Sequence, residues 1–152
     1  MLEIERKFLV TRVPDDLGRF PAVRIEQAYI STDPVIRIRR AGERYFLTCK
    51  GRGLLAREEF ELELSPDAYA RLLPKADGTH IIKNRYRVPL DTWTAEVDVF
   101  AEPLTPLVLA EVEFPTEDAA RAFTPPDWFG TEVTHDPAYT NAALSRQENV
   151  LP

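Results

Sequence analysis

The stretch Glu3–Phe8, EIERKF, alternates charged side chains with side chains of other kinds. In an extended strand, residues two apart share a face and lie ~6.6 Å from each other. Glu3, Glu5 and Lys7 therefore project from one face of a strand. This period of two predicts a strand with one charged and one apolar face.

The same period recurs along the chain and predicts eight strands separated by turn residues such as Gly, Pro and Asp. The predicted strands cover residues 2–10, 24–31, 35–41, 43–50, 56–64, 79–89, 92–100 and 106–114. Eight strands in hairpin order favour a closed antiparallel barrel, which leaves no exposed sheet edge. The predicted fold class is α+β, mainly β, in a single domain over residues 1–152.

Three short helices are predicted beside this barrel. Ser65 and Thr116 are suitable N-cap residues for the first two, because their hydroxyls can accept a hydrogen bond from the first turn. The predicted helices cover residues 68–73, 119–123 and 137–147.

Composition restricts the possible functions. The 152 residues are 44% hydrophobic and 29% charged, which is typical of one soluble globular domain. The net charge of −6 disfavours general nucleic-acid binding. The sequence has no apolar run long enough for a membrane span, no secretory signal and only one cysteine. We therefore expect a cytoplasmic protein, monomeric or homodimeric, with no nucleic-acid or membrane partner.

Charges of like sign gather on one face of each predicted strand. The basic groups are Arg37 and Arg39, and Lys83, Arg85 and Arg87; the acidic groups are Glu59, Glu61 and Glu63, Glu96 and Asp98, and Glu111 and Glu113. A solvated face would explain any one strand. Because like charges repel, the whole set favours a barrel with this face turned inward, as a polar tunnel.

Such a tunnel suits phosphate chemistry. Carboxylates are ligands for Mg²⁺ or Mn²⁺, and Arg and Lys donate charge-assisted hydrogen bonds to phosphate oxygens. Metal and cations together are the usual machinery of phosphoryl transfer. The sequence has no Gly-rich phosphate loop, so side chains must hold the phosphates.

The stretch Glu3–Phe8 resembles the ExExK signature of the CYTH superfamily, the triphosphate tunnel metalloenzymes. The resemblance continues in order through QAY (27–29), RIR (37–39), TCK (48–50), REEFE (57–61), KNR (83–85), EVDVF (96–100), AEVEF (110–114) and EVT (132–134), before Tyr139 and Asn141. It implies an eight-stranded tunnel, a divalent-metal requirement and a small-molecule substrate that carries a triphosphate.

The resemblance also implies roles for individual residues. Its metal ligands would be Glu3, Glu5, Asp98, Glu111 and Glu113. Its substrate-binding residues would be Arg37, Arg39, Lys50, Lys83, Arg85 and Glu61, and its catalytic residues Lys7, Glu5 and Arg39. Lys7 would contact phosphate or orient the attacking water. One departure is the run NAAL at 141–144, where many short bacterial members have Asn-Ser-Asn-Leu.

We expect hydrolysis of inorganic triphosphate to pyrophosphate and phosphate, with Mg²⁺ or Mn²⁺ and two ions during turnover. The chain is short and begins at the ExExK motif, which favours inorganic triphosphate over a substrate with a bulky organic group. Other activities of this superfamily remain open: a class IV-type adenylate cyclase, or a nucleoside or thiamine triphosphatase. A polyphosphate- or nucleotide-binding module without catalysis is the alternative outside enzymes.

Overall fold

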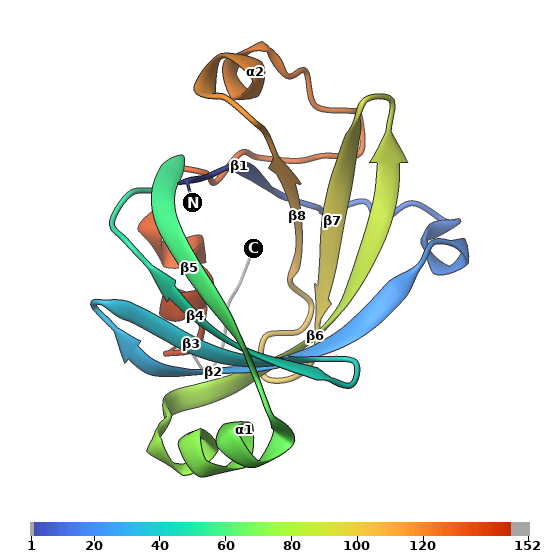
Figure 1. The fold of residues 1–152 in the computed structure, drawn as a ribbon. Coiled ribbons are helices and arrows are strands. Elements are labelled where there is room, and N and C mark those ends of the chain that lie inside the picture. The colour runs from blue at the N-terminus through green and yellow to red at the C-terminus, as the bar shows by residue number, and fades with distance from the viewer. Residues whose placement is uncertain (1, 147–152) are drawn as a thin grey trace.

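Eight antiparallel strands close into a barrel in the computed structural model, which describes residues 2–146 (Figure 1). The strands are β1 (Leu2–Leu9), β2 (Ala22–Thr32), β3 (Val35–Ala41), β4 (Arg44–Lys50), β5 (Ala56–Leu64), β6 (Asp77–Leu90), β7 (Trp93–Phe100) and β8 (Val108–Glu113). They pair in the order β1-β5-β4-β3-β2-β6-β7-β8, and β8 pairs with β1. The predicted fold class is confirmed. The prediction of one domain over residues 1–152 extends beyond the described residues and stays a prediction.

Two strands begin earlier than predicted, because their pairing partners extend them. β2 starts at Ala22, which pairs with Tyr86 of β6, and β6 starts at Asp77, which pairs with Tyr29 of β2. Alternation alone does not show these ends, since Pro21 and Gly78 interrupt the pattern beside them.

The first two helices begin at their predicted caps. The hydroxyl of Ser65 accepts a hydrogen bond at the start of α1 (Pro66–Leu72), and that of Thr116 at the start of α2 (Glu117–Ala122). A 3₁₀ turn, η2 (Leu73–Lys75), follows α1, and another, η1 (Leu17–Arg19), lies between β1 and β2. Figure 1 places α1 and α2 on opposite sides of the ring of strands.

The prediction of one continuous helix over 137–147 is wrong within the described residues, and Gln147 lies outside them. The chain instead forms a 3₁₀ turn, η3 (Pro137–Tyr139), and then α3 (Asn141–Leu144). Thr140 separates them, because its backbone is extended (φ −68°, ψ 147°) and its hydroxyl accepts a hydrogen bond from the Ala143 amide. A residue that caps a new helix cannot continue the preceding turn.

Strand β1 divides one of its edges between two partners. Residues 2–4 pair with β5, whereas the same edge farther along β1 bonds to residues 130–133. Gly130 donates to the Leu9 carbonyl at 2.7 Å, and Val133 donates to the Lys7 carbonyl at 2.8 Å. The segment after α2 therefore completes the wall of the barrel beside the ExExK motif.

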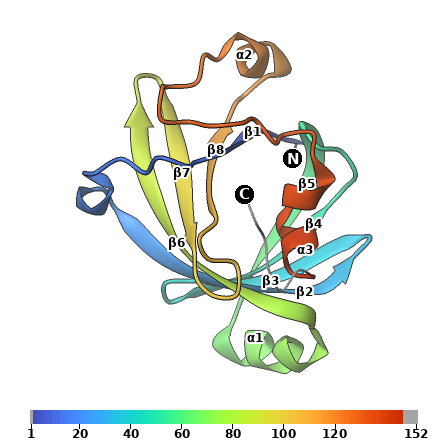
Figure 2. The ribbon, with the colours of Figure 1, turned by 180° about the vertical axis from the view of Figure 1, so that it is seen from behind.

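An apolar cluster fills one end of the barrel. Its buried members are Tyr29, Ile81, Phe100, Leu104, Leu107, Leu109, Val133 and Leu144. Several of these residues face inward, because Tyr29 pairs with Arg37 and Phe100 with Lys83 across neighbouring strands. Leu144 of α3, which lies beside β2, completes the cluster (Figure 2). The cluster therefore borders the charged part of the interior.

Within residues 2–146, no helix is long and apolar enough to cross a lipid bilayer.

Candidate active site

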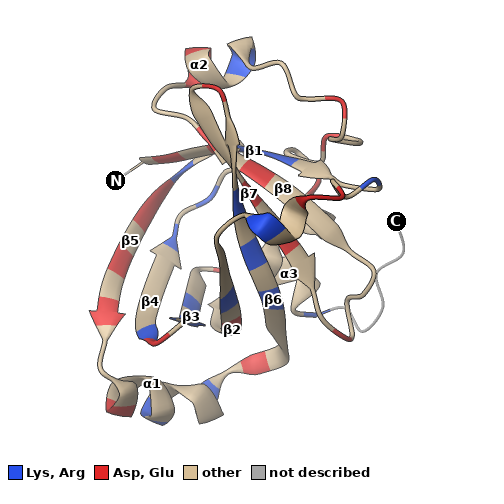
Figure 3. Cartoon of the chain, turned by 90° about the vertical axis from the view of Figure 1, so that its right-hand side faces the viewer, with Lys and Arg blue, Asp and Glu red and all other residues tan. Residues whose placement is uncertain are grey.

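The charged faces of the strands turn inward and line a cavity of about 230 Å³, which we call the tunnel. Figure 3 shows acidic residues recurring along β5 and basic residues along β6. The acidic lining residues are Glu3, Glu5, Glu59, Glu61, Glu96, Glu111 and Glu113. The other lining residues are Arg37, Arg39, Lys50, Arg85 and Asn141. Nine of the predicted site residues therefore share one cavity.

Three carboxylates form the closest acidic group in the tunnel. One carboxylate oxygen from each of Glu3, Glu5 and Glu113 lies within 4.8 Å of the others. Glu5 and Glu113 face each other across β1 and β8 in the sheet register. The neighbouring Glu111 has a buried oxygen, Oε1, without a hydrogen-bond partner among residues 2–146.

Burial and mutual repulsion disfavour negative charge in this group. Burial, together with Glu111 and Glu3, raises the pKa of Glu5 to about 8. Burial and the charges of Glu96 and Glu3 also raise the pKa of Glu113. A bound cation would offset this repulsion, and carboxylate oxygens are the ligands that hard divalent cations prefer. The residues therefore fit a divalent metal ion.

Cations lie on the opposite side of the same tunnel. Lys50 Nζ lies 3.0 Å from Glu3 and 3.5 Å from Glu59, so it borders the carboxylate group. Arg37 donates to the Thr48 hydroxyl at 3.2 Å, and its buried Nε has no partner among the described residues. Burial and the nearby charges of Arg37 and Arg85 lower the pKa of Arg39. An anion in the tunnel would relieve this repulsion among cations.

Gln27 also belongs to the cationic side, although it is not among the predicted site residues. Its Oε1 accepts a hydrogen bond from Arg39 at 3.0 Å, whereas its buried Nε2 has no partner within residues 2–146. The resemblance included this residue, but alternation alone does not distinguish it from other polar residues of β2.

Asp98 and Lys83, predicted in the metal and phosphate groups, lie outside the tunnel lining. They pair with each other at 2.7 Å, and Arg85 binds the same carboxylate through two hydrogen bonds of 2.7 and 2.8 Å. Burial would raise the pKa of Asp98, but Arg85 and Lys83 lower it below its usual value. Asp98 is therefore the partner of two cations, and it is not one of the three clustered carboxylates; its role as a metal ligand stays a prediction.

Lys7 lies beside the tunnel. Its ammonium donates to the Tyr139 carbonyl at 3.0 Å and lies 3.6 Å from the Glu111 carboxylate. With Glu5 and Thr134, it lines a cavity of about 10 Å³. A cavity of this size has room for about one water molecule.

Glu61 and Glu63 share one face of β5, and their positions along the strand distinguish them. Glu61 faces the tunnel and accepts a hydrogen bond from Thr48 at 3.1 Å. Glu63 is exposed and pairs with Arg44 at 2.8 Å. Glu59 and Glu96 also reach the tunnel, although sequence analysis left them out of the site. Both residues could have been predicted from the period of two, because Glu59 shares a strand face with Glu61 and Glu96 shares one with Asp98.

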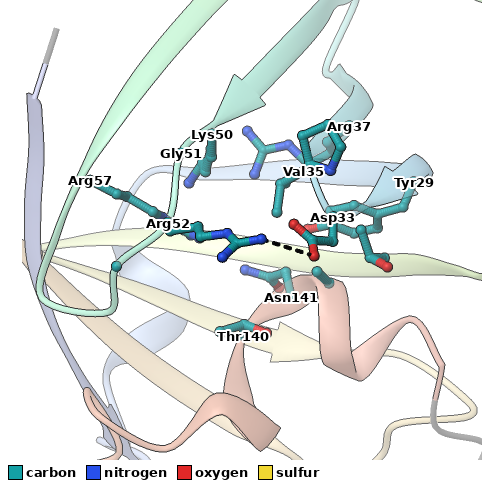
Figure 4. A pocket seen from close by; sticks show the side chains of 14 residues that line it. Tyr29, Asp33, Val35, Arg37, Lys50, Gly51, Arg52, Arg57, Thr140 and Asn141 are labelled. Carbon is teal, nitrogen blue, oxygen red and sulfur yellow. Dashed lines mark ion pairs between the residues drawn. The ribbon is translucent and has the colours of Figure 1, made fainter.

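A second cavity of about 290 Å³, the outer chamber, adjoins the tunnel (Figure 4). Arg37, Lys50 and Asn141 line both cavities. Exposed Arg52, after β4, pairs with Asp33 in the β2–β3 turn at 3.5 Å. The outer chamber therefore continues the cationic lining beyond the tunnel.

Comparisons with known proteins agree with this architecture. The CYTH domain family model matches residues 1–132. The chain is 47% identical over 149 residues to an inorganic triphosphatase of Nitrosomonas europaea, covering 95% of this chain and 97% of that protein. It is 34% identical over 145 residues to an inorganic triphosphatase of Acetivibrio thermocellus, covering 93% and 92%.

Solved structures share the fold. The crystal structure of the inorganic triphosphatase NE1496 matches with a TM-score of 0.72 and 43% identity over 97% of each chain. The PH1012 protein of Pyrococcus horikoshii matches with a TM-score of 0.59 and 20% identity, covering 99% of this chain and 94% of that one. The second likeness concerns the fold alone.

Proposed function

Because this chain belongs to the CYTH domain family, we propose that it hydrolyses inorganic triphosphate to pyrophosphate and phosphate in a reaction that requires a divalent metal ion. The observation that carries this proposal is the tunnel itself, in which the Glu3, Glu5 and Glu113 group borders a cationic wall. Two relatives that match over most of the chain are named inorganic triphosphatases.

The cations of the tunnel bind the substrate in this proposal. Arg37, Arg39, Lys50 and Arg85 approach from three strands, β3, β4 and β6. Guanidinium groups donate paired, charge-assisted hydrogen bonds to phosphate oxygens. A linear triphosphate carries four or five negative charges, so it would neutralise cations that now repel each other. Glu61 fits a supporting role, because it accepts from Thr48, which in turn accepts from Arg37.

The carboxylate group would hold the metal, with Glu3, Glu5 and Glu113 as ligands and Glu111 next to them. When bound, Mg²⁺ or Mn²⁺ would neutralise developing charge on phosphate oxygens and lower the pKa of water. The four carboxylates support the prediction of two ions during turnover, which stays a prediction.

Lys7 is well placed to orient a water molecule. Its ammonium is held by the Tyr139 carbonyl, and it lines the small cavity together with Glu5. In hydrolysis, the water oxygen forms a bond to a terminal phosphorus while the bond from that phosphorus to the bridging oxygen breaks. Arg39, half-buried on the cationic side, would stabilise charge that builds up during this exchange.

Asp98 and Lys83 act indirectly in this proposal. The two hydrogen bonds from Arg85 to Asp98 hold the guanidinium in one orientation at the tunnel wall. Lys83 lies on the same face of β6, two residues from Arg85, with a side chain that has no exposed surface. These two residues therefore position a substrate-binding cation rather than contact the metal.

The outer chamber favours inorganic triphosphate over a nucleotide. Among the described residues that line it, Tyr29 is the only aromatic one, and it is 2% exposed. The chamber thus offers no open ring on which a base could stack. The cytoplasmic location and the oligomeric state stay predictions.

The decisive experiment measures phosphate release by the purified protein from tripolyphosphate and from ATP, with Mg²⁺, with Mn²⁺ and with EDTA. We expect metal-dependent release from tripolyphosphate and much slower release from ATP. Loss of ATP without orthophosphate would indicate the cyclase instead. Binding of tripolyphosphate without turnover would indicate a binding module.

Two variants connect this activity with the tunnel. Glu5→Gln is expected to abolish the metal-dependent turnover, since it replaces a carboxylate metal ligand with a neutral amide. Glu63→Gln is the matched control, because Glu63 is an exposed glutamate on β5 that faces Arg44. Unchanged turnover in Glu5→Gln would remove Glu5 from the mechanism.

A further inference from the structure

Three residues form a neck between the tunnel and the outer chamber. Arg37 and Lys50 reach it from strands β3 and β4, and Asn141 reaches it from α3 (Figure 4). Asn141 is the residue of this set that comes from the C-terminal segment. A phosphate chain that extends from the tunnel toward the chamber must pass these three side chains.

The amide of Asn141 has a defined orientation. Lys83 Nζ lies 3.2 Å from Asn141 Oδ1, and an ammonium group can only donate hydrogen bonds. The amide oxygen therefore faces Lys83, and the amide nitrogen faces away from it. Within residues 2–146, no acceptor is recorded for Asn141 Nδ2.

The partner that sets this orientation is itself held in place. The Lys83 side chain has 0% exposed surface, its ammonium lies 2.7 Å from Asp98, and it lies 5.2 Å from the centre of the Phe100 ring. Lys83 cannot turn toward solvent without breaking these contacts. The ammonium therefore presents the Asn141 amide to the neck as a fixed donor.

We propose that Asn141 is a substrate-binding residue whose Nδ2 donates a hydrogen bond to a non-bridging oxygen of the triphosphate at the neck. This inference rests on the proposed function and extends its substrate-binding set from the barrel strands to α3. Donors from Arg37, Lys50 and Asn141 would then surround one phosphate group. Substrate binding would also fasten the C-terminal segment to the barrel.

A purely structural role makes a different prediction. If Asn141 serves only to connect α3 with Lys83, any side chain whose oxygen accepts the hydrogen bond from Lys83 should preserve substrate binding. Asn141→Asp separates the two roles, because it keeps the shape and an oxygen for Lys83 but replaces the donor with a second acceptor. That carboxylate oxygen would repel phosphate and compete for Arg37 and Lys50.

The test compares Asn141→Asp with Asn84→Asp, which adds the same charge to the exposed, outer side of β6. For Asn141→Asp we expect an unchanged or higher Tm and a KM for tripolyphosphate raised about tenfold or more, with kcat changed much less. Tripolyphosphate in EDTA should raise the Tm of the wild type and of Asn84→Asp, but not that of Asn141→Asp. A wild-type KM and a wild-type Tm shift in Asn141→Asp would overturn the proposal.

A second variant covers the case in which Asn141→Asp does not fold. Asn141→Ala removes both the donor and the Lys83 contact, and it should raise KM about tenfold, as loss of a hydrogen bond to a charged group does. A wild-type KM in folded Asn141→Ala would equally overturn the proposal.

The binding measurement distinguishes this inference from the proposed function. If the wild type is stabilised by tripolyphosphate but does not hydrolyse it, the proposed hydrolysis fails while the effect of Asn141→Asp on binding still decides the role of Asn141. If tripolyphosphate neither stabilises the wild type nor is hydrolysed, both proposals are overturned.

Discussion

Lys83 Nζ lies 2.7 Å from Oδ2 of Asp98, and the two side chains are 0% and 1% exposed. The pair joins β6 to β7 on the inward face of the barrel, beside the tunnel, and Arg85 shares its carboxylate. One negative charge therefore serves two buried cations. Removing it would leave both cations without their closest partner.

Asp98→Asn is consequently expected to destabilise the protein by about 3–5 kcal/mol, the usual cost of leaving buried charge unpaired. Urea denaturation at neutral pH measures this free energy of unfolding. The control is Asp118→Asn, since Asp118 is 97% exposed and its pair with Arg121 should contribute less than about 1 kcal/mol. Equal stability of the two variants would show that Asp98 does not carry this role.

Glu113→Gln should behave in the opposite way. Burial and the charges of Glu96 and Glu3 raise the pKa of Glu113, so its negative charge is unfavourable in the folded protein. Replacing it with a neutral amide is expected to leave the Tm unchanged or raise it in EDTA. The same change should remove most of the Tm increase caused by Mn²⁺, because one metal ligand is lost.

Thermal denaturation with and without Mn²⁺ tests this expectation. Glu63→Gln is again the control, and it should keep the wild-type response to Mn²⁺. A full Mn²⁺ response in Glu113→Gln would show that the ion binds without Glu113.

The pair Arg6–Glu132 should make stability depend on pH. Arg6 donates two hydrogen bonds, of 2.8 and 2.6 Å, to the Glu132 carboxylate. The hydrogen bond from Arg6, against the opposing effect of burial, lowers the pKa of Glu132. The pair therefore stabilises the folded protein at pH values above the pKa of glutamate in the unfolded chain. This stabilisation is lost as the pH falls through the lower pKa that Glu132 has in the folded protein.

Glu132→Gln is expected to cost up to about 1 kcal/mol at pH 7, because the pair is partly exposed. The difference from the wild type should stay constant above about pH 5 and disappear in more acidic solution. Chemical denaturation between pH 3 and pH 7 measures both curves. A difference that persists unchanged to pH 3 would assign the cost to packing rather than to charge.

Leu144→Ala tests the apolar cluster at one end of the barrel. Leu144 has 0% exposed surface and packs in the same cluster as Tyr29, Phe100 and Leu109. Removing its side chain is expected to cost about 2–5 kcal/mol, from lost burial and the cavity left behind. Denaturation with urea measures the loss. A cost below about 1 kcal/mol would show that α3 does not contribute to this end of the barrel.

Much of the architecture could be predicted from residue order alone. Alternation over residues 35–41 places Arg37 and Arg39 on one face of their strand. Alternation over residues 56–64 does the same for Glu59 and Glu61. In the structure, all four side chains line the tunnel. This works because the period of a strand is strictly two, so the side of each residue follows from its position. The pattern within each strand is therefore enough to predict which charged residues face the tunnel.

What the sequence by itself determined is the barrel, the inward charged face and the set of residues from which a site could form. Only the tertiary structure decided that Asp98 pairs with Lys83 and Arg85 while Glu113 joins Glu3 and Glu5. It also decided that Asn141 reaches the neck. The physical reason is that such contacts depend on the register between strands and on the docking of α3, which join residues far apart in the chain. A pattern within one strand shows which way a side chain points, but it does not show which charge from another strand lies next to it.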